Sequence, residues 1–121
     1  MAKQPQTKET IDVCTTVDPG ICGFPCNIRA RKADARTVWV EISATGCEQI
    51  EKLAQQFDQI SMQELFAPLT RNKVYVAAQR CGCHSSCIIP AAILKTAEAA
   101  MEMALPKQVR IRFETCDKTE K

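Results

Sequence analysis

The spacing of apolar residues changes near residue 45, and this change restricts the chain to a mixed fold. Before it, Val38, Val40 and Ile42 alternate with polar residues, as on a half-buried strand. After it, Ile50 and Leu53 begin an apolar stripe that has the spacing of a helix. Strands with one apolar face need helices to cover that face. The sequence therefore predicts an α+β fold, with an antiparallel sheet of three to four strands and two main helices packed on one face.

The same patterns assign the individual elements. Ile28 and Ala30 should face the helices, while Arg29 and Arg31 should face solvent. A chain of 121 residues is long enough to form one core, so we expect a single domain at 11–114 between flexible tails at 1–10 and 115–121. The predicted strands are 11–17, 27–32, 37–43 and 109–114, the main helices are 47–58 and 87–105, and shorter helical segments are 61–66 and 73–80.

Eight cysteines are many for a chain of this length, and their meaning depends on the compartment. Residues 1–10 are polar and contain no apolar core of a signal peptide, and no apolar run is long enough to cross a membrane. We therefore expect a cytoplasmic protein with reduced thiols, in which clustered cysteines bind metal or do redox chemistry. The net charge of +2 comes from Lys and Arg spread along the chain, which predicts neither a nucleic-acid nor a membrane partner.

Three cysteines lie at predicted element boundaries. Cys22 lies in the bend between the first two strands, Cys47 opens the first long helix, and Cys87 opens the last one. Helix N-termini carry unpaired N–H groups and a partial positive charge, which favours a thiolate over a thiol. Cys47 and Cys87 are therefore candidate metal ligands or nucleophiles. Cys14, on a strand, and Cys116, in a polar tail, are expected to have no ligand role.

A second group of candidate ligands is local in the sequence. Cys81, Cys83, His84 and Cys87 offer three sulfurs and one imidazole within seven residues of a polar loop. Tetrahedral zinc accepts sets of three cysteines and one histidine, and iron–sulfur clusters accept cysteine thiolates. Cys26 could join Cys22 across the chain, but the pattern leaves the roles of Cys26 and Cys81 open.

The order of these motifs resembles the IscU/NifU-like family of iron–sulfur cluster scaffold proteins. The resemblance rests on Cys22-Gly23, Gly46-Cys47 and the Cys87-Ile88-Ile89 start of an Ala-rich helix, over roughly residues 20 to 104. It implies that Cys22, Cys47 and Cys87 hold a transient cluster or a metal ion near one tip of the sheet, and that protein partners take part in cluster delivery. Phe24 and Ser86 differ from that family, which has Asp and His there. The stretches 19–24 and 90–95 also resemble a family of small uncharacterised proteins.

Three function classes agree with these observations. The first is a protein that binds zinc or an iron–sulfur cluster through Cys22, Cys47 and Cys87, with Cys83 or His84 as the fourth ligand, and acts as a cluster assembly or carrier factor. The second is a thiol redox enzyme in which Cys87 is the nucleophile and Cys81 or Cys83 resolves it. The third is a protein–protein adaptor whose loop is held by zinc. The sequence does not decide whether catalytic turnover occurs, and it leaves the oligomeric state undetermined.

Overall fold

The computed structural model of the protein describes residues 12–20, 24–44 and 46–116. The tail predicted at 1–10 and residues 117–121 of the tail predicted at 115–121 lie outside the described residues. Within the described part, no helix is both long and apolar enough to cross a membrane.

The fold is α+β, as predicted, with one antiparallel sheet of four strands. In chain order the elements are β1 (Val13–Val17), β2 (Cys26–Asp34), β3 (Thr37–Ala44), α2 (Glu48–Ala54), β4 (Gln59–Ser61), α3 (Met62–Leu65), a 3₁₀ turn (Leu69–Arg71), α4 (Lys73–Arg80) and α5 (Ile89–Ala100).

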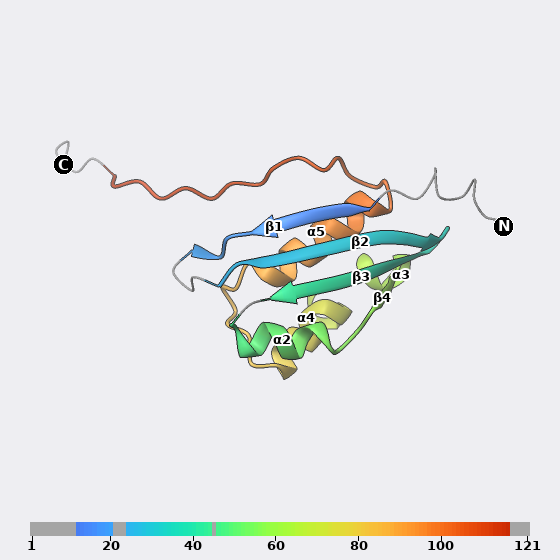
Figure 1. The fold of residues 1–121 in the computed structure, drawn as a ribbon, viewed down its shortest axis with the longest axis horizontal. Helices are drawn as coiled ribbons and strands as arrows, with labels where there is room; N and C mark the ends of the chain where they lie inside the picture. The colour runs from blue at the N-terminus through green and yellow to red at the C-terminus, as the bar shows by residue number, and fades with distance from the viewer. Residues whose placement is uncertain (1–11, 21–23, 45, 117–121) are drawn as a thin grey trace.

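The strands follow one another in space in the order in which they occur in the chain, β1-β2-β3-β4 (Figure 1). Every neighbouring pair is antiparallel. The alternation predicted for β2 and β3 is confirmed, since Ile28, Ala30 and Val38 are buried while Arg29 and Arg31 are exposed. The sheet therefore has one apolar face and one polar face, and β1 forms an open edge.

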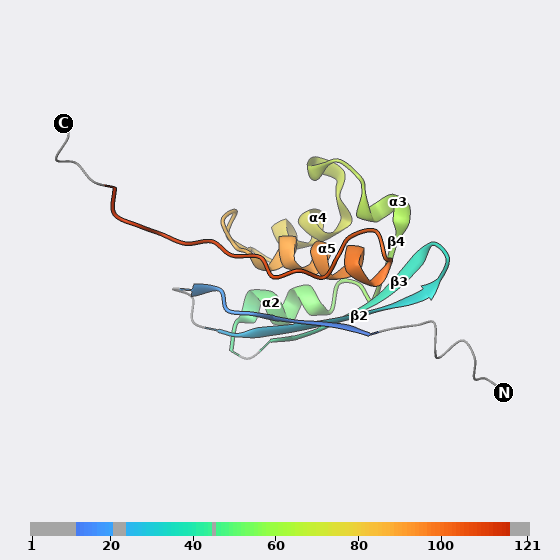
Figure 2. The ribbon, with the colours of Figure 1, turned by 90° about the horizontal axis from the view of Figure 1, so that it is seen from above.

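The helices cover the apolar face of the sheet, as Figure 2 shows for α2, α4 and α5. Helix α5 packs against β1, β2 and β3, while α2 packs between β3 and α4. Thr96 in the middle of α5 is buried, and its hydroxyl lies 2.8 Å from the Thr15 hydroxyl in β1. This contact ties the last helix to the edge strand. The largest fully buried apolar side chains of the core are Ile28, Val38, Leu53, Ile60, Val74, Ile89 and Ile93.

Both main helices are shorter than the sequence predicted. The C-terminal end of α5 comes at Ala100 because Glu102 adopts a left-handed conformation with φ 65°, and the Met103 amide donates to the Glu98 carbonyl over 2.9 Å. This is a Schellman motif, which usually has glycine at the left-handed position, so a glutamate there did not indicate a helix end. Helix α2 ends at Ala54, where the Gln55 and Gln56 amides turn back to carbonyls three residues earlier.

The prediction that 109–114 joins the sheet is wrong. Residues 107–116 form no helix or strand and are exposed, and the fourth strand is β4, which pairs with β3. Three residues are too few to show an alternating pattern in the sequence. The Met62 amide extends this pairing by donating to the Arg36 carbonyl over 2.7 Å. Alternation at 109–114 indicates a segment with one apolar side, but pairing also requires that the segment lie along a strand edge.

The segment between α3 and α4 depends on one buried asparagine. The Asn72 side-chain oxygen accepts a hydrogen bond from the Val74 amide at the start of α4. Its amide group donates to the carbonyls of Glu64, Leu65 and Ala67, at 3.2, 3.3 and 3.4 Å. Asn72 therefore caps α4 and also satisfies carbonyl oxygens at the end of α3. It fixes the direction in which α4 carries the chain toward Cys81.

Candidate thiolate site

Several cysteines are brought to one end of the sheet by the strands. Cys26 is the first residue of β2, where it lies opposite Val17 at the end of β1 and opposite Ala44 at the end of β3. Cys47 follows β3 by three residues and occupies the N-cap position of α2. Its thiol donates to the Gln49 side-chain oxygen over 3.5 Å. The same end of the sheet therefore carries Cys26, buried on the helix-covered face, and Cys47, half-buried beside it.

The loop between α4 and α5 brings further cysteines to this end (Figure 1). Helix α4 ends in a Schellman motif in which Gly82 has φ +77° and the Cys83 amide donates to the Ala78 carbonyl over 3.0 Å. A second turn follows, in which the Cys87 amide donates to the His84 carbonyl, also over 3.0 Å. Cys81 is buried, and Cys83 and Cys87 are half-buried against the core. Backbone hydrogen bonds thus fix both ends of this short loop.

The electrostatics show which thiols are close neighbours. Burial first, and then the charges of Cys87, Cys81 and Cys47, together raise the pKa of Cys83 from 9.0 to about 11. The pKa of Cys26 is also raised to about 11, first by burial and then by Cys87 and Cys47. Cysteines from three separate parts of the chain therefore interact through their charges. We call Cys26, Cys47, Cys81, Cys83 and Cys87 the cysteine cluster.

An aromatic side chain lies beside the cluster. A Cβ atom added to Gly46 would be only 2.8 Å from Cδ1 of the Phe24 ring, and Gly46 has φ +95°. Both the contact and the backbone conformation therefore require glycine directly before Cys47. The Gly46-Cys47 pair that the sequence suggested as a motif thus has a steric reason within this fold.

The structure brings some of the predicted site residues together and leaves others apart. Cys47, Cys83 and Cys87 belong to the cluster, whereas the His84 side chain is exposed. Cys22 lies outside the described residues, so the expected meeting of Cys22, Cys47 and Cys87 stays a prediction. Among residues 12–20, 24–44 and 46–116, no three or more histidine, cysteine or acidic side chains are grouped so that they could hold a metal ion. The seven cysteines in this part of the chain form no disulfide.

The expectation that Cys87 opens the last helix needs correction. Helix α5 begins at Ile89, with Ile88 as its N-cap residue. The 84–87 turn comes before the helix, and Ile88 makes no side-chain cap hydrogen bond. Pro90 lies in the first turn, as expected for a residue without an N–H group. With only seven residues, α2 also gives Cys47 a weaker helix terminus than the predicted 47–58 would.

The sequence left the role of Cys26 open, although a signal was present. Cys26, Ile28 and Ala30 are spaced two apart, so on one strand they share a face. The structure buries all three under the helices and leaves Cys26 only 1% exposed. Extending the predicted strand by one residue, from Asn27 to Cys26, would have placed this thiol at the helix-covered end of the sheet.

The raised thiol pKa values predict how the metal-free, reduced protein responds to pH. In the folded state Cys26 keeps its proton up to a pKa of about 11, whereas a thiol of the unfolded chain loses it near 9.0. Folding is then favoured fully below about pH 9, and the unfolding free energy should fall as pH rises from about 9 to 11, by about 2 kcal/mol for Cys26. Urea denaturation across this pH range measures the effect.

Matched variants separate this contribution from other groups that titrate at high pH. Cys26→Ala should reduce the fall in stability, because the buried thiol is gone. Cys116→Ala, at an exposed position after α5, should leave the fall unchanged. Equal slopes in Cys26→Ala and the parent protein would contradict the assignment.

Comparison with known proteins places the chain in a family. Residues 13–113 match the model of a family of unknown function, DUF6951. The chain belongs to this family. The DUF6951 region begins with β1 and continues beyond α5, so it includes the whole cysteine cluster and the exposed segment up to Phe113. Comparison with curated proteins and with solved structures gave no match.

Proposed function

We propose that this DUF6951 protein binds a zinc ion or an iron–sulfur cluster through cysteine thiolates at the end of the sheet. The ligands are Cys22, Cys47 and Cys87, with Cys83 as the fourth. One observation carries the proposal: Cys47, which follows β3, lies near enough to the loop between α4 and α5 that its charge, like that of Cys87, raises the pKa of Cys83. Exposure of the His84 side chain favours Cys83 over His84 as the fourth ligand. The finer proposal is a role in cluster assembly or delivery to protein partners, as the resemblance to the scaffold family implies.

The chemistry of the donor set fits this group of ligands. Thiolate sulfur is a soft ligand that selects zinc or iron–sulfur clusters over magnesium or calcium. In the metal-free protein, burial and then the charges of Cys87, Cys81 and Cys47 raise the pKa of Cys83 to about 11, so further negative charge is disfavoured at this half-buried position. A bound cation or cluster would offset that charge, so binding should release the proton of Cys83. Leu53, Ile89 and other core residues position the thiols without supplying ligands.

The redox-enzyme alternative makes a different demand on the same thiols. A resolving or attacking cysteine works as a thiolate and needs a pKa near or below the working pH. The pKa of Cys83 is raised to about 11, so this thiol keeps its proton near neutral pH. That favours metal binding, in which the metal itself displaces the proton, over nucleophilic attack by Cys83. The third alternative, an adaptor whose loop is held by zinc, also requires zinc binding at these thiols. It differs from the proposed function only in the protein partner that the zinc-bound form contacts.

Anaerobic purification followed by metal and acid-labile sulfide analysis tests the proposal. We expect either zinc without sulfide or iron with sulfide. Reduced metal-free protein should bind zinc with release of at least about one proton per ion near pH 7, seen by calorimetry in buffers of different ionisation enthalpy. Affinity should rise about tenfold per pH unit for each proton displaced. Protein that contains no metal or sulfide, and takes up no zinc at micromolar concentrations, would refute it.

A further inference from the structure

The chain beyond α5 forms an exposed arm with one apolar side. We call residues 107–116 the C-terminal arm; it leaves the body after Pro106 and runs past the end of the sheet (Figure 1). Val109, Ile111 and Phe113 are 56%, 64% and 92% exposed, and they alternate with Arg110 and Arg112. Single exposed apolar residues are ordinary, but a row of three large ones on an extended segment indicates a surface that is covered in the functional state.

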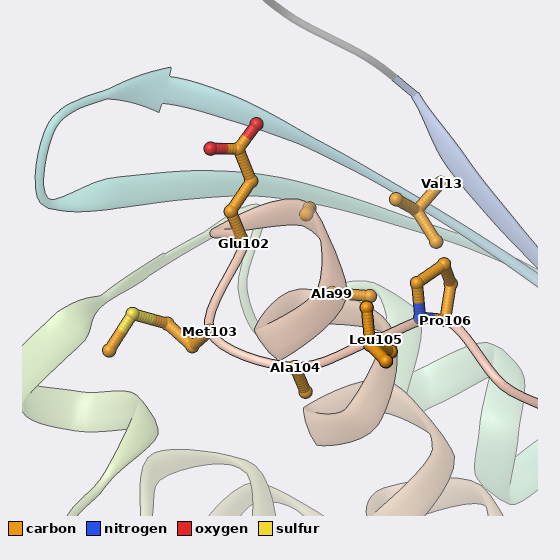
Figure 3. A pocket seen from close by; sticks show the side chains of 8 residues that line it. Val13, Ala99, Glu102, Met103, Ala104, Leu105 and Pro106 are labelled. Carbon is orange, nitrogen blue, oxygen red and sulfur yellow. The ribbon is translucent and has the colours of Figure 1, made fainter.

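An exposed strand edge that could accept the C-terminal arm lies along β1. Among the residues that the structure describes, β1 pairs with β2 alone, so its other edge presents backbone N–H and C=O groups that no described strand pairs with. Beside it, a cavity of about 420 Å³ is lined by Val13 of β1, Ala99 of α5 and residues that include Leu105 and Pro106. Figure 3 shows the Val13, Ala99, Leu105 and Pro106 side chains gathered there, and Glu102 and Met103 also line the cavity. An added strand would cover this apolar edge.

We propose that two copies of the chain exchange C-terminal arms. Residues 109–113 of each copy add as a fifth strand to the β1 edge of the other copy, with Val109, Ile111 and Phe113 toward the helix-covered side. This is strand addition, in which main-chain hydrogen bonds give affinity and alternate side chains fill an apolar surface. The proposal is independent of metal binding.

Three observations specify a second copy as the occupant. The arm segment 109–113 and β1 each have five residues, so a complete pairing is available. Asp18 follows β1, which contains no basic residue, and the arm carries Arg110 on its polar side, whereas Asp12 already pairs with Arg29 and Arg31, and Arg112 pairs with Glu114. The arm is bare in the single chain although it leaves the body beside β1, at Pro106. A twofold exchange covers both arms and both edges with one repeated contact.

Sedimentation of the full reduced chain tests the proposal first. We expect a species of twice 13.4 kDa, and a double variant Ile111→Lys/Phe113→Asp should weaken dimerisation by about tenfold or more. Ala99→Glu should weaken it equally from the receiving side, with Val13→Asp as a second edge variant if the first does not fold. Arg112→Gln, on the polar side of the arm, is the matched control and should keep the dimer.

Mixing provides the decisive measurement. The arm variant keeps an intact β1 edge, and the edge variant keeps an intact arm, so an equimolar mixture should recover dimers held by one exchanged arm. Hydrogen exchange should show protected amides at 109–113 only in the dimer. The proposal would be overturned if the parent protein remained a monomer at about 100 µM, a concentration at which even a weak dimer forms. A dimer that survives the arm variant, or amides at 109–113 protected in a monomer, would overturn it as well.

Discussion

Cys47→Ser and Cys87→Ser are each expected to lower the zinc affinity or the cluster occupancy by about 100-fold or more. Serine is nearly the same size as cysteine, but its hydroxyl is a poor ligand for a soft metal and does not ionise near neutral pH. Cys47 and Cys87 come from different sides of the cluster and both influence the pKa of Cys83 and of Cys26. Metal and sulfide content per chain after anaerobic reconstitution, together with zinc titration, measures the loss.

The chain supplies controls for this experiment. Cys14 is exposed on β1 and Cys116 is exposed in the C-terminal arm, so Cys14→Ser and Cys116→Ser should keep full occupancy. Cys83→Ser should lose more affinity than His84→Ala if Cys83 is the fourth ligand. If both Cys47→Ser and Cys87→Ser kept full metal or cluster content, the proposed ligand set would be contradicted. The hypothesis of a thiol redox enzyme with Cys87 as the nucleophile would then remain.

Asn72→Ala is expected to lower the unfolding free energy by about 3 kcal/mol. Loss of an N-cap side chain costs about 1 kcal/mol, and buried carbonyl oxygens left without a donor add about 1 to 3 kcal/mol. Asn72 is 3% exposed, and its side chain serves both α4 and the end of α3. Urea denaturation of the metal-free protein checks the value.

Two variants make the interpretation specific. Asn72→Asp keeps the oxygen that accepts from the Val74 amide but loses the donors to the α3 carbonyls. It therefore separates capping from carbonyl satisfaction. Thr70→Ala, at an exposed neighbouring position, should change stability by less than about 0.5 kcal/mol. A loss below about 1 kcal/mol in Asn72→Ala would show that α4 does not depend on this side chain.

The sheet was predictable where each strand has one buried face. Alternation through Ile28 and Ala30, and through Val38 and Val40, specified both the strands and the direction of their side chains. The same rule failed at 109–114, because alternation describes a segment and says nothing about which edge that segment reaches. β4 was missed for the opposite reason, since three residues pair with β3 without enough length to show a period.

The candidate site was predictable only in part. Element boundaries in the sequence pointed to Cys47 and Cys87, and the polar loop pointed to Cys83. Whether a thiol near a boundary faces the cluster depends on turns of one or two residues, such as the left-handed Gly82 before Cys83. Cys26 joins the cluster through its place at the end of β2, a position that depends on where the strand begins. The resemblance to the scaffold family stays a prediction that metal analysis can test.

The strands lie in the sheet in the same order as in the chain, and this arrangement affects how the molecule folds. Strands β1, β2 and β3 can pair one after another as successive hairpins, and β4 joins β3 after the short helix α2, so the contacts within the sheet are close in the sequence. The Thr96–Thr15 contact, by contrast, joins residues 81 positions apart and forms only when α5 docks. Cys26, Cys47 and Cys83 to Cys87 come together at that same late step. We therefore expect a metal ion to slow unfolding rather than speed folding, because the ligands are assembled after the hairpins have formed.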